Sequence, residues 1–295
     1  MMRVTQNQLY DTLLTGIRNQ LDIQARGNAQ VSSGKRFQRP AQAALDYKTS
    51  LDIRSAQTGV QSSLKAINTA STRLNNSMST LNSMQQLLVR AQTLAVQQSS
   101  GQIGASERQV AAVEVTRLRD QLLGFANQQL DGQSLFAGTA VNQNAFTLNT
   151  GTGVVSYSGN ATDRTVAISS SQTVASNVRG DKTAFTQAFS AIQALNTALN
   201  TNNITGIQTA LGQLNTAGNS MTDLTAEVGS RVHTLNLQQQ SFEDMKFNLE
   251  KRLNDHEGVD IPATISQLQQ ASVAMQAAFS QVASLRSLTL VNFLR

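Results

Sequence analysis

The longest regular feature of the 295-residue chain is a run of core-type positions between residues 60 and 95. Successive positions are alternately four and three residues apart, which is the heptad spacing of a helix packed along another helix. At about 1.5 Å per residue, one helix over this run is roughly 50 Å long. The run predicts a mainly α fold, an elongated antiparallel helical bundle or coiled coil. Its positions are Val60, Leu64, Ile67, Ser71, Leu74, Met78, Leu81, Gln85, Leu88, Gln92 and Ala95.

Two further stretches repeat this spacing, at residues 111–129 and 228–253, and the second ends near Gly258. Residues 99–104 predict a break before the first of them, and Ser106 with Gln109 fits a capping box that opens a helix. The two sets are Ala111, Val115, Leu118, Leu122, Phe125 and Gln129, and Val228, Val232, Leu235, Gln239, Phe242, Leu249 and Leu253.

The middle of the chain differs, because glycine becomes frequent between residues 132 and 180 and the heptads disappear. Residues 154–158 and 164–168 partly alternate in polarity around a glycine-containing turn, which predicts a short β hairpin or small sheet. Helix is expected to return at about Thr183, with a turn at residues 200–206. The β segment therefore interrupts a bundle that both halves of the chain build.

The two ends form a third class of segment. Residues 4–33 predict one helix, and Asp260 is a candidate N-cap of a last helix with Pro262 in its first turn. The apolar faces of the two helices are the candidate assembly interface. Its residues are Leu9, Leu13, Ile17, Leu21, Ile265, Leu268, Met275, Phe279, Val282, Leu285, Leu288, Val291, Phe293 and Leu294.

Each end needs a partner surface. In the C-terminal segment, burial of some ten apolar side chains contributes roughly 15–30 kcal/mol. Fixing the backbone of its roughly 35 residues costs about 35–70 kcal/mol. Two arrangements remain open: the ends pair within one chain, or they become ordered chiefly on assembly with other subunits.

Composition excludes several chemistries. The chain has no cysteine, so it has no disulfide, zinc–thiolate site, iron–sulfur cluster or cysteine nucleophile. The net charge of +5 is spread without a dense basic stripe, which argues against nucleic-acid binding. Neither a cleaved signal peptide nor a membrane-spanning segment is expected.

No residue pattern predicts catalysis, a cofactor or a metal. His256 and Glu257 invite a metal interpretation, but the second histidine of a metalloprotease motif is absent because position 260 is Asp. We therefore expect these two residues at a solvated helix end. Gly151 and Gly153 lack the third glycine and following helix of a nucleotide-binding loop.

Several motifs give the chain a family resemblance. Residues 31–36 (Val-Ser-Ser-Gly-Lys-Arg), 90–97 (Arg-Ala-Gln-Thr-Leu-Ala-Val-Gln) and 291–295 (Val-Asn-Phe-Leu-Arg) resemble segments of the flagellin superfamily. Residues 132–138, with their Leu-Phe-Ala-Gly turn, are similar to the hook–filament junction branch, hook-associated protein 3. Pro40 and the residues after it stand where flagellins carry paired aspartates, which favours the junction branch over the flagellins.

The resemblance implies five segments. These are an N-terminal assembly helix and turn (1–40), the first half of the bundle (41–134), a small β-rich outer insert (135–182), the second half (183–258) and a C-terminal assembly helix (259–295).

The resemblance also implies a structural subunit of the bacterial flagellum and no enzyme. Such a subunit joins hook-associated protein 1 to flagellin in a ring of its own copies. It leaves the cell through the flagellar type III apparatus, and an export chaperone binds its C-terminal region. The alternatives are a flagellin that forms the filament itself, or a non-flagellar helical scaffold.

Overall fold

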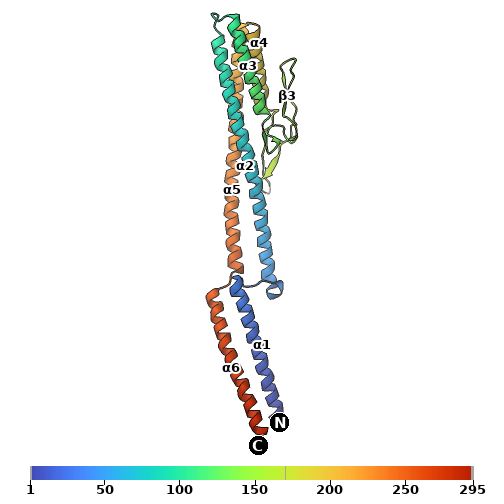
Figure 1. Cartoon of the computed structure of the whole chain (residues 1–295), viewed down its shortest axis with the longest axis vertical. Helices are drawn as coiled ribbons and strands as arrows, with labels where there is room; N and C mark the ends of the chain where they lie inside the picture. Colours follow the sequence, from blue (N-terminus) through green and yellow to red (C-terminus); the bar gives the residue numbers. More distant parts are fainter. Residues whose placement is uncertain (1, 170, 294–295) are drawn as a thin grey trace. The chain divides into compact units, whose positions relative to one another are not determined.

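A computed structural model of the chain describes residues 2–169 and 171–293, and it describes side chains for residues 8–169 and 171–284. The predicted fold class, mainly α with a small β-rich insert, is confirmed (Figure 1). The helices are α1 (Met2–Ser33), the short 3-10 helix η1 (Pro40–Gln42), α2 (Ala44–Gln98), α3 (Ala105–Ala126), α4 (Thr183–Asn200), α5 (Ile204–Glu257) and α6 (Ile261–Phe293). The strands are β1 (Gln129–Leu130), β2 (Gln133–Ser134), β3 (Phe146–Leu148), β4 (Val155–Tyr157), β5 (Thr165–Ala167) and β6 (Thr173–Ala175).

The chain divides into two compact units. One comprises the residues up to Gly59 and from Lys246 onward, and the other comprises Val60–Met245. The first unit contains α1 and α6, and the second contains α3, α4 and the strands. Helices α2 and α5 contribute residues to both units.

The core of the second unit runs along α2 and α5. All predicted heptad positions from Val60 to Ala95 are buried or half-buried, as the spacing requires. Gln85 Nε2 donates to Thr222 Oγ1 at 2.8 Å, and one heptad later Gln92 Nε2 donates to the Leu214 carbonyl at 3.1 Å. Because residue numbers rise along α2 as they fall along α5, the two helices run antiparallel. Residues of the two helices with no exposed surface include Leu74, Leu81, Leu88, Met221, Val228 and Leu235.

After the insert, α4 begins at Thr183 as expected, and α5 begins at Ile204, inside the predicted turn at residues 200–206. The capping box at Ser106 is wrong. Helix α3 begins at Ala105, one residue before Ser106. Its N-cap is Gly104, and no side chain caps it. Gln129, which the heptad spacing placed in a helix, lies in β1.

A buried arginine closes the turn between α2 and α3. Arg108 is 2% exposed, and it donates to the Ser100 carbonyl at 2.7 Å and to the Gln98 carbonyl at 3.2 Å. It also donates to the side-chain oxygen of Asn202, in the turn before α5. The guanidinium thereby satisfies carbonyls that a helix end and turn leave without intrahelical donors.

The predicted strands are present, but the hairpin between them is wrong. Residues 155–157 pair with Phe146–Leu148, and residues 165–167 pair with Thr173–Ala175, each antiparallel. Each partner strand is three residues long, which is too short for polarity alternation to reveal it in the sequence.

Aromatic rings hold the insert on α4. The ring centroids of Phe136 and Phe185 lie 5.0 Å apart, and those of Phe146 and Phe185 lie 5.4 Å apart. Gly138 ends the buried Leu-Phe-Ala-Gly turn with a φ of +70°, and a Cβ there would lie 2.3 Å from the Asn160 carbonyl oxygen. The motif at residues 132–138 therefore has a packing role, because its Phe fills the core and its last Gly permits a close turn.

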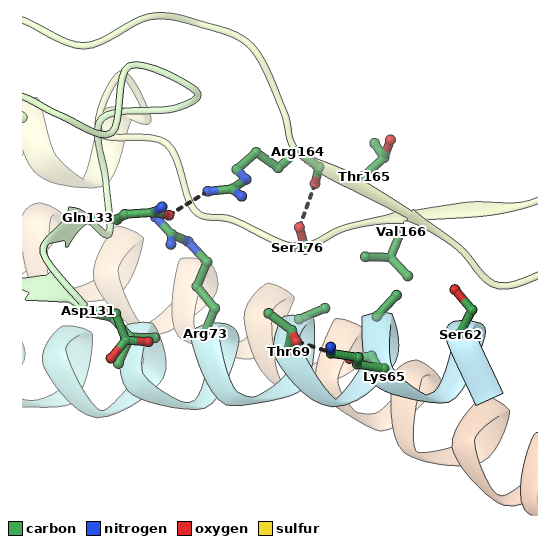
Figure 2. A pocket seen from close by; sticks show the side chains of 13 residues that line it. Ser62, Lys65, Thr69, Arg73, Asp131, Gln133, Arg164, Thr165, Val166 and Ser176 are labelled. Carbon is green, nitrogen blue, oxygen red and sulfur yellow. Dashed lines mark hydrogen bonds between the residues drawn. The ribbon is translucent and has the colours of Figure 1, made fainter.

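A cavity of about 600 Å³ lies where the insert meets α2, and its lining includes Lys65, Arg73 and Arg164 (Figure 2). Arg73 bridges the two elements, because its Nη2 donates to the carbonyl of Ser134 at the end of β2.

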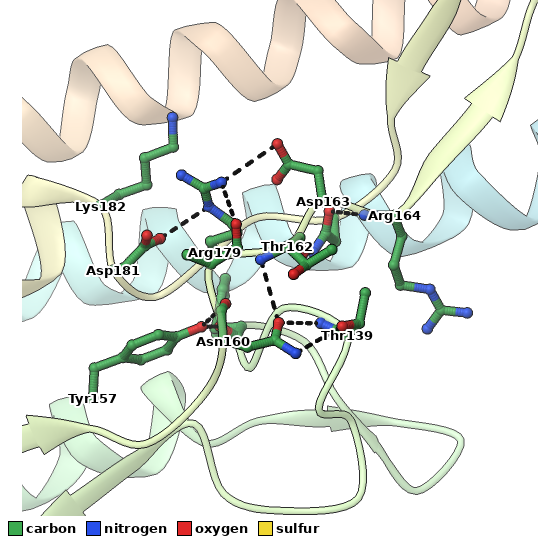
Figure 3. Close-up of polar contacts among 12 residues, drawn as sticks. Thr139, Tyr157, Asn160, Thr162, Asp163, Arg164, Arg179, Asp181 and Lys182 are labelled. Carbon is green, nitrogen blue, oxygen red and sulfur yellow. Dashed lines mark hydrogen bonds and ion pairs between the residues drawn. The ribbon is translucent and has the colours of Figure 1, made fainter.

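A polar network fixes the loops of the insert (Figure 3). The Tyr157 hydroxyl lies 2.8 Å from the Asn160 carbonyl, and the Asn160 side chain accepts from the Thr139 amide at 2.9 Å. Arg179 Nε donates to Asp181 at 3.0 Å. Burial, reinforced by the negative charge of Asp181, raises the pKa of Tyr157, so the phenol stays protonated as a donor.

Candidate assembly surface

The first unit is built on the antiparallel pairing of α1 and α6, whose far ends carry the two chain termini (Figure 1). On each helix, one series of buried and half-buried positions is alternately three and four residues apart, as in a coiled-coil seam. On α1 this series is Tyr10, Leu13, Ile17, Gln20, Gln24, Gly27 and Val31, and Leu14, Ile23 and Gln30 are half-buried beside it. On α6 the series is Thr264, Leu268, Ala271, Met275, Ala278 and Val282, and Ser272 is half-buried beside it.

Small residues bring the two backbones close together. A Cβ on Gly27 would lie 2.8 Å from a methyl carbon of Leu268, so this glycine leaves the space that the leucine fills. Ala271 is 4% exposed and continues the seam on α6. Asp260 caps α6, as predicted, because its carboxylate accepts from the Ala263 amide at 3.0 Å.

The structure divides the predicted interface residues into two groups. Five of them lie in the seam: Leu13, Ile17, Leu268, Met275 and Val282. Four others are exposed: Leu9 and Leu21 at 49%, Ile265 at 42% and Phe279 at 53%. The side chains of Leu285, Leu288, Val291 and Phe293 and the whole of Leu294 lie outside the described residues.

The exposed apolar side chains lie beside the seam. Ile265 and Phe279 are two heptads apart, so they share one side of α6, and Val273 is 65% exposed on another side. The seam is thus closed within the chain while other large apolar side chains contact solvent. In the structure, the two end helices pair within one chain and still present apolar surface.

At the end of the first unit that lies away from the chain termini, several residues contact Glu257, the last residue of α5. Its side chain is 8% exposed, and its carboxylate accepts two bonds from Arg54 Nη2, at 2.7 and 2.8 Å, and lies 3.1 Å from Lys35 Nζ. The Glu257 carbonyl accepts from the Arg36 amide at 2.7 Å. Residues on three segments, the turn after α1, the first part of α2 and the end of α5, therefore meet at one carboxylate.

This arrangement corrects the expectation of a solvated helix end at His256 and Glu257. His256 is half-buried, and its Nε2 lies 3.0 Å from the Asp46 carbonyl. Burial by itself would raise the pKa of Glu257, but hydrogen bonds from Lys35, Arg54 and Ser50 outweigh it and lower the pKa. Glu257 is therefore ionised at neutral pH.

Sequence reasoning missed this cluster because Arg54 and Glu257 are 203 positions apart. The one signal of this cluster in the sequence was the Ser-Ser-Gly-Lys-Arg segment. It resembles a segment of the flagellin superfamily, but the sequence alone gives it no structural role. Its Gly34 has a φ of +68°, and the Gly34 carbonyl accepts from the Val259 amide at 3.1 Å. The segment is the turn that fastens the end of α1 to the α5–α6 connection.

Other kinds of site find no support in the described part of the chain. No group of three or more His, Asp or Glu side chains there could hold a metal ion. No described helix is both long and apolar enough to cross a membrane.

Comparisons with known proteins agree with the resemblance. Residues 4–141 match the family model of the bacterial flagellin N-terminal helical region. A comparison with curated protein sequences gives no match.

Three solved structures share the fold. A protein from Vibrio parahaemolyticus described as a flagellar hook-associated protein is 19% identical, with a TM-score of 0.64 over 74% of this chain and 100% of its own. FlgL from Bacillus cereus is 19% identical, with a TM-score of 0.60 over 69% of this chain and 99% of its own. The flagellar junction protein FlgL from Legionella pneumophila is 14% identical, with a TM-score of 0.58 over 69% of this chain and 98% of its own.

Proposed function

We infer that this chain, a member of the flagellin superfamily through its N-terminal helical region, is a structural subunit of the bacterial flagellum at the hook–filament junction. The observation that carries this function is the α1–α6 pair, a seam closed within the chain and flanked by exposed large apolar side chains. Such surface is unfavourable on an isolated protein and favourable in an assembly, where neighbouring subunits remove it from water. The fold shared with flagellar hook-associated proteins supports a structural role and no enzymatic one.

In this function the copies form a ring that contacts hook-associated protein 1 on one side and flagellin on the other. The exposed residues Leu9, Leu21, Ile265 and Phe279 contact neighbouring copies, and the seam residues hold α1 and α6 together. The β-rich insert lies on the outside of the ring. The subunit is exported by the type III apparatus with a chaperone on its C-terminal region, and a chain without cysteine forms no disulfide before export.

The test is the double substitution Leu21→Gln and Phe279→Gln in a strain that lacks the chromosomal copy. Both side chains are about half exposed in the monomer, so we expect a change in unfolding free energy within about 0.5 kcal/mol. Incorporation at the hook–filament boundary, followed by immunoelectron microscopy, should be lost, and flagellin should appear in the medium. The matched control is Leu45→Gln, which changes a leucine that is 78% exposed on α2.

Normal incorporation of the double variant would show that these faces do not contact neighbours. The two alternatives predict other outcomes. Long filaments grown from the purified protein alone indicate a flagellin, and binding of a helical partner without polymerisation indicates a scaffold.

A further inference from the structure

The cavity between α2 and the insert has a cationic lining that the assembly function does not use. It measures about 600 Å³ and lies within the second unit. Lys65 and Arg73 reach it from α2, and Arg164 reaches it from the loop just before β5, whereas Asp131 is the one carboxylate among its lining residues. Three positive charges thus share a cavity with one negative charge.

Arg73 is a buried cation, and no acidic side chain in the described part of the chain forms an ion pair with it. It is 7% exposed, its Nη2 donates to the Ser134 carbonyl, and its Nε has no hydrogen-bond partner among the described residues. No described carboxylate lies within 4 Å of it, whereas Arg54, Arg90 and Arg179 each have a carboxylate partner. A buried charge without a partner is costly, so this position favours a negatively charged ligand.

Arg164 adds to the excess of positive charge in the cavity. Its Nη1 donates to Gln133 Oε1 at 3.1 Å, and no described carboxylate pairs with it. Figure 2 shows the guanidinium groups of Arg73 and Arg164 both beside Gln133, one from α2 and one from the insert. Burial and the positive charge of Arg164 both lower the pKa of Arg73, as expected for two cations held near each other.

Neutral donors are available at the same place. The Gln133 oxygen is occupied by Arg164, so the Gln133 amide N–H groups remain free to donate. Guanidinium forks match the paired oxygens of carboxylates and phosphates, and both groups would bring Arg73 and Arg164 the missing negative charge.

We propose that this cavity is a binding site for an oxyanion of the carboxylate or phosphate type, held between Arg73 and Arg164 with Lys65 as a further cation. The oxyanion neutralises the repulsion between the two guanidinium groups and fastens the insert to α2. This proposal is independent of the α1–α6 surface, which belongs to the other unit.

The test uses the full chain and inorganic phosphate as the probe. Titration calorimetry and thermal unfolding are compared in sodium phosphate and in sodium chloride of equal ionic strength. We expect saturable phosphate binding with a rise in Tm, and an affinity at least tenfold lower in Arg164→Gln. The control is Arg117→Gln, which removes the same charge from an exposed position on α3 and should bind phosphate like the wild type.

Equal effects of phosphate and chloride would overturn the proposal, and so would equal phosphate affinities of R164Q and R117Q. Arg73 is not substituted alone, because its bond to Ser134 gives it a structural role. If R164Q lowers Tm already in chloride and leaves phosphate affinity unchanged, Arg164 serves packing only and the proposal fails.

A second arm identifies the source of the oxyanion. Sedimentation velocity is measured for the wild type and R164Q in chloride and in phosphate. If the ligand is an acidic side chain of a neighbouring copy, both phosphate and R164Q reduce self-association. If it is a free anion, self-association is unchanged while phosphate binding persists, and either result supports the site.

Discussion

Replacing Glu257 by glutamine removes the charge on which three segments of the first unit converge, while keeping the size of the side chain. The carboxylate receives two bonds from Arg54 and one contact from Lys35, at 2.7, 2.8 and 3.1 Å. Hydrogen bonds to charged groups contribute about 1.5–3 kcal/mol each. Glutamine keeps one acceptor oxygen, and the partner side chains are 45% and 44% exposed, so water compensates part of the loss. We therefore expect a loss of about 2 kcal/mol in this unit.

The assay is native-state hydrogen exchange of the Arg36 amide and of the amides along α1 and α6. Because the Arg36 amide donates to the Glu257 carbonyl, its exchange reports opening of this junction. A loss of about 2 kcal/mol corresponds to roughly 30-fold faster exchange where local opening governs it. The matched control is Glu250→Gln, one heptad earlier on α5, whose ion pair with Lys246 is exposed and 3.7 Å long. That control should change exchange by less than about threefold.

The contribution of Glu257 to stability also depends on pH. The pKa of Glu257 in the folded protein is below its ordinary value of 4.5, so its stabilising contribution is complete above that pH and is lost as the pH falls through the lower pKa. Protection in the wild type should therefore fall below about pH 4.5 toward the level of E257Q, after the common effect of other carboxylates is subtracted. Exchange rates of E257Q and E250Q that are equal across this range would refute the reasoning.

Three further substitutions test the packing. Gly27→Leu should destabilise the α1–α6 pair by about 1–3 kcal/mol in hydrogen exchange, because a Cβ there already lies 2.8 Å from a leucine methyl carbon of α6, whereas Gly16→Leu enters open space and should not. Gly180→Ala should lower Tm, with a loss of about 1–3 kcal/mol, because its Cβ would lie 2.7 Å from the Phe146 ring; an unchanged Tm would contradict this packing. Arg108→Met should cost about 2–4 kcal/mol in urea unfolding, because it leaves buried carbonyls without donors; a loss below about 0.5 kcal/mol would mean that water satisfies them.

The sequence alone determined the helical architecture, since it depends on short-range periodicity. The heptads of residues 60–95 predicted which side of α2 is buried, and Asp260 predicted the start of α6, because both signals act within a few residues. The family resemblance likewise rested on contiguous motifs. The apolar spacing also placed Leu9, Leu21, Ile265 and Phe279 in the candidate assembly interface. It could not distinguish a side chain that is exposed from one that lies in the seam.

Only the tertiary structure decided which distant residues meet. The strands 155–157 and 165–167 were expected to form a hairpin or small sheet, yet each pairs with another three-residue strand that carries little pattern of its own. Glu257 was expected in solvent, but its burial depends on Lys35 and Arg54, which lie more than 200 positions earlier. Periodicity records only whether a side chain faces a core. The charge partner of a side chain depends on how separate segments fold against one another, which no local pattern encodes.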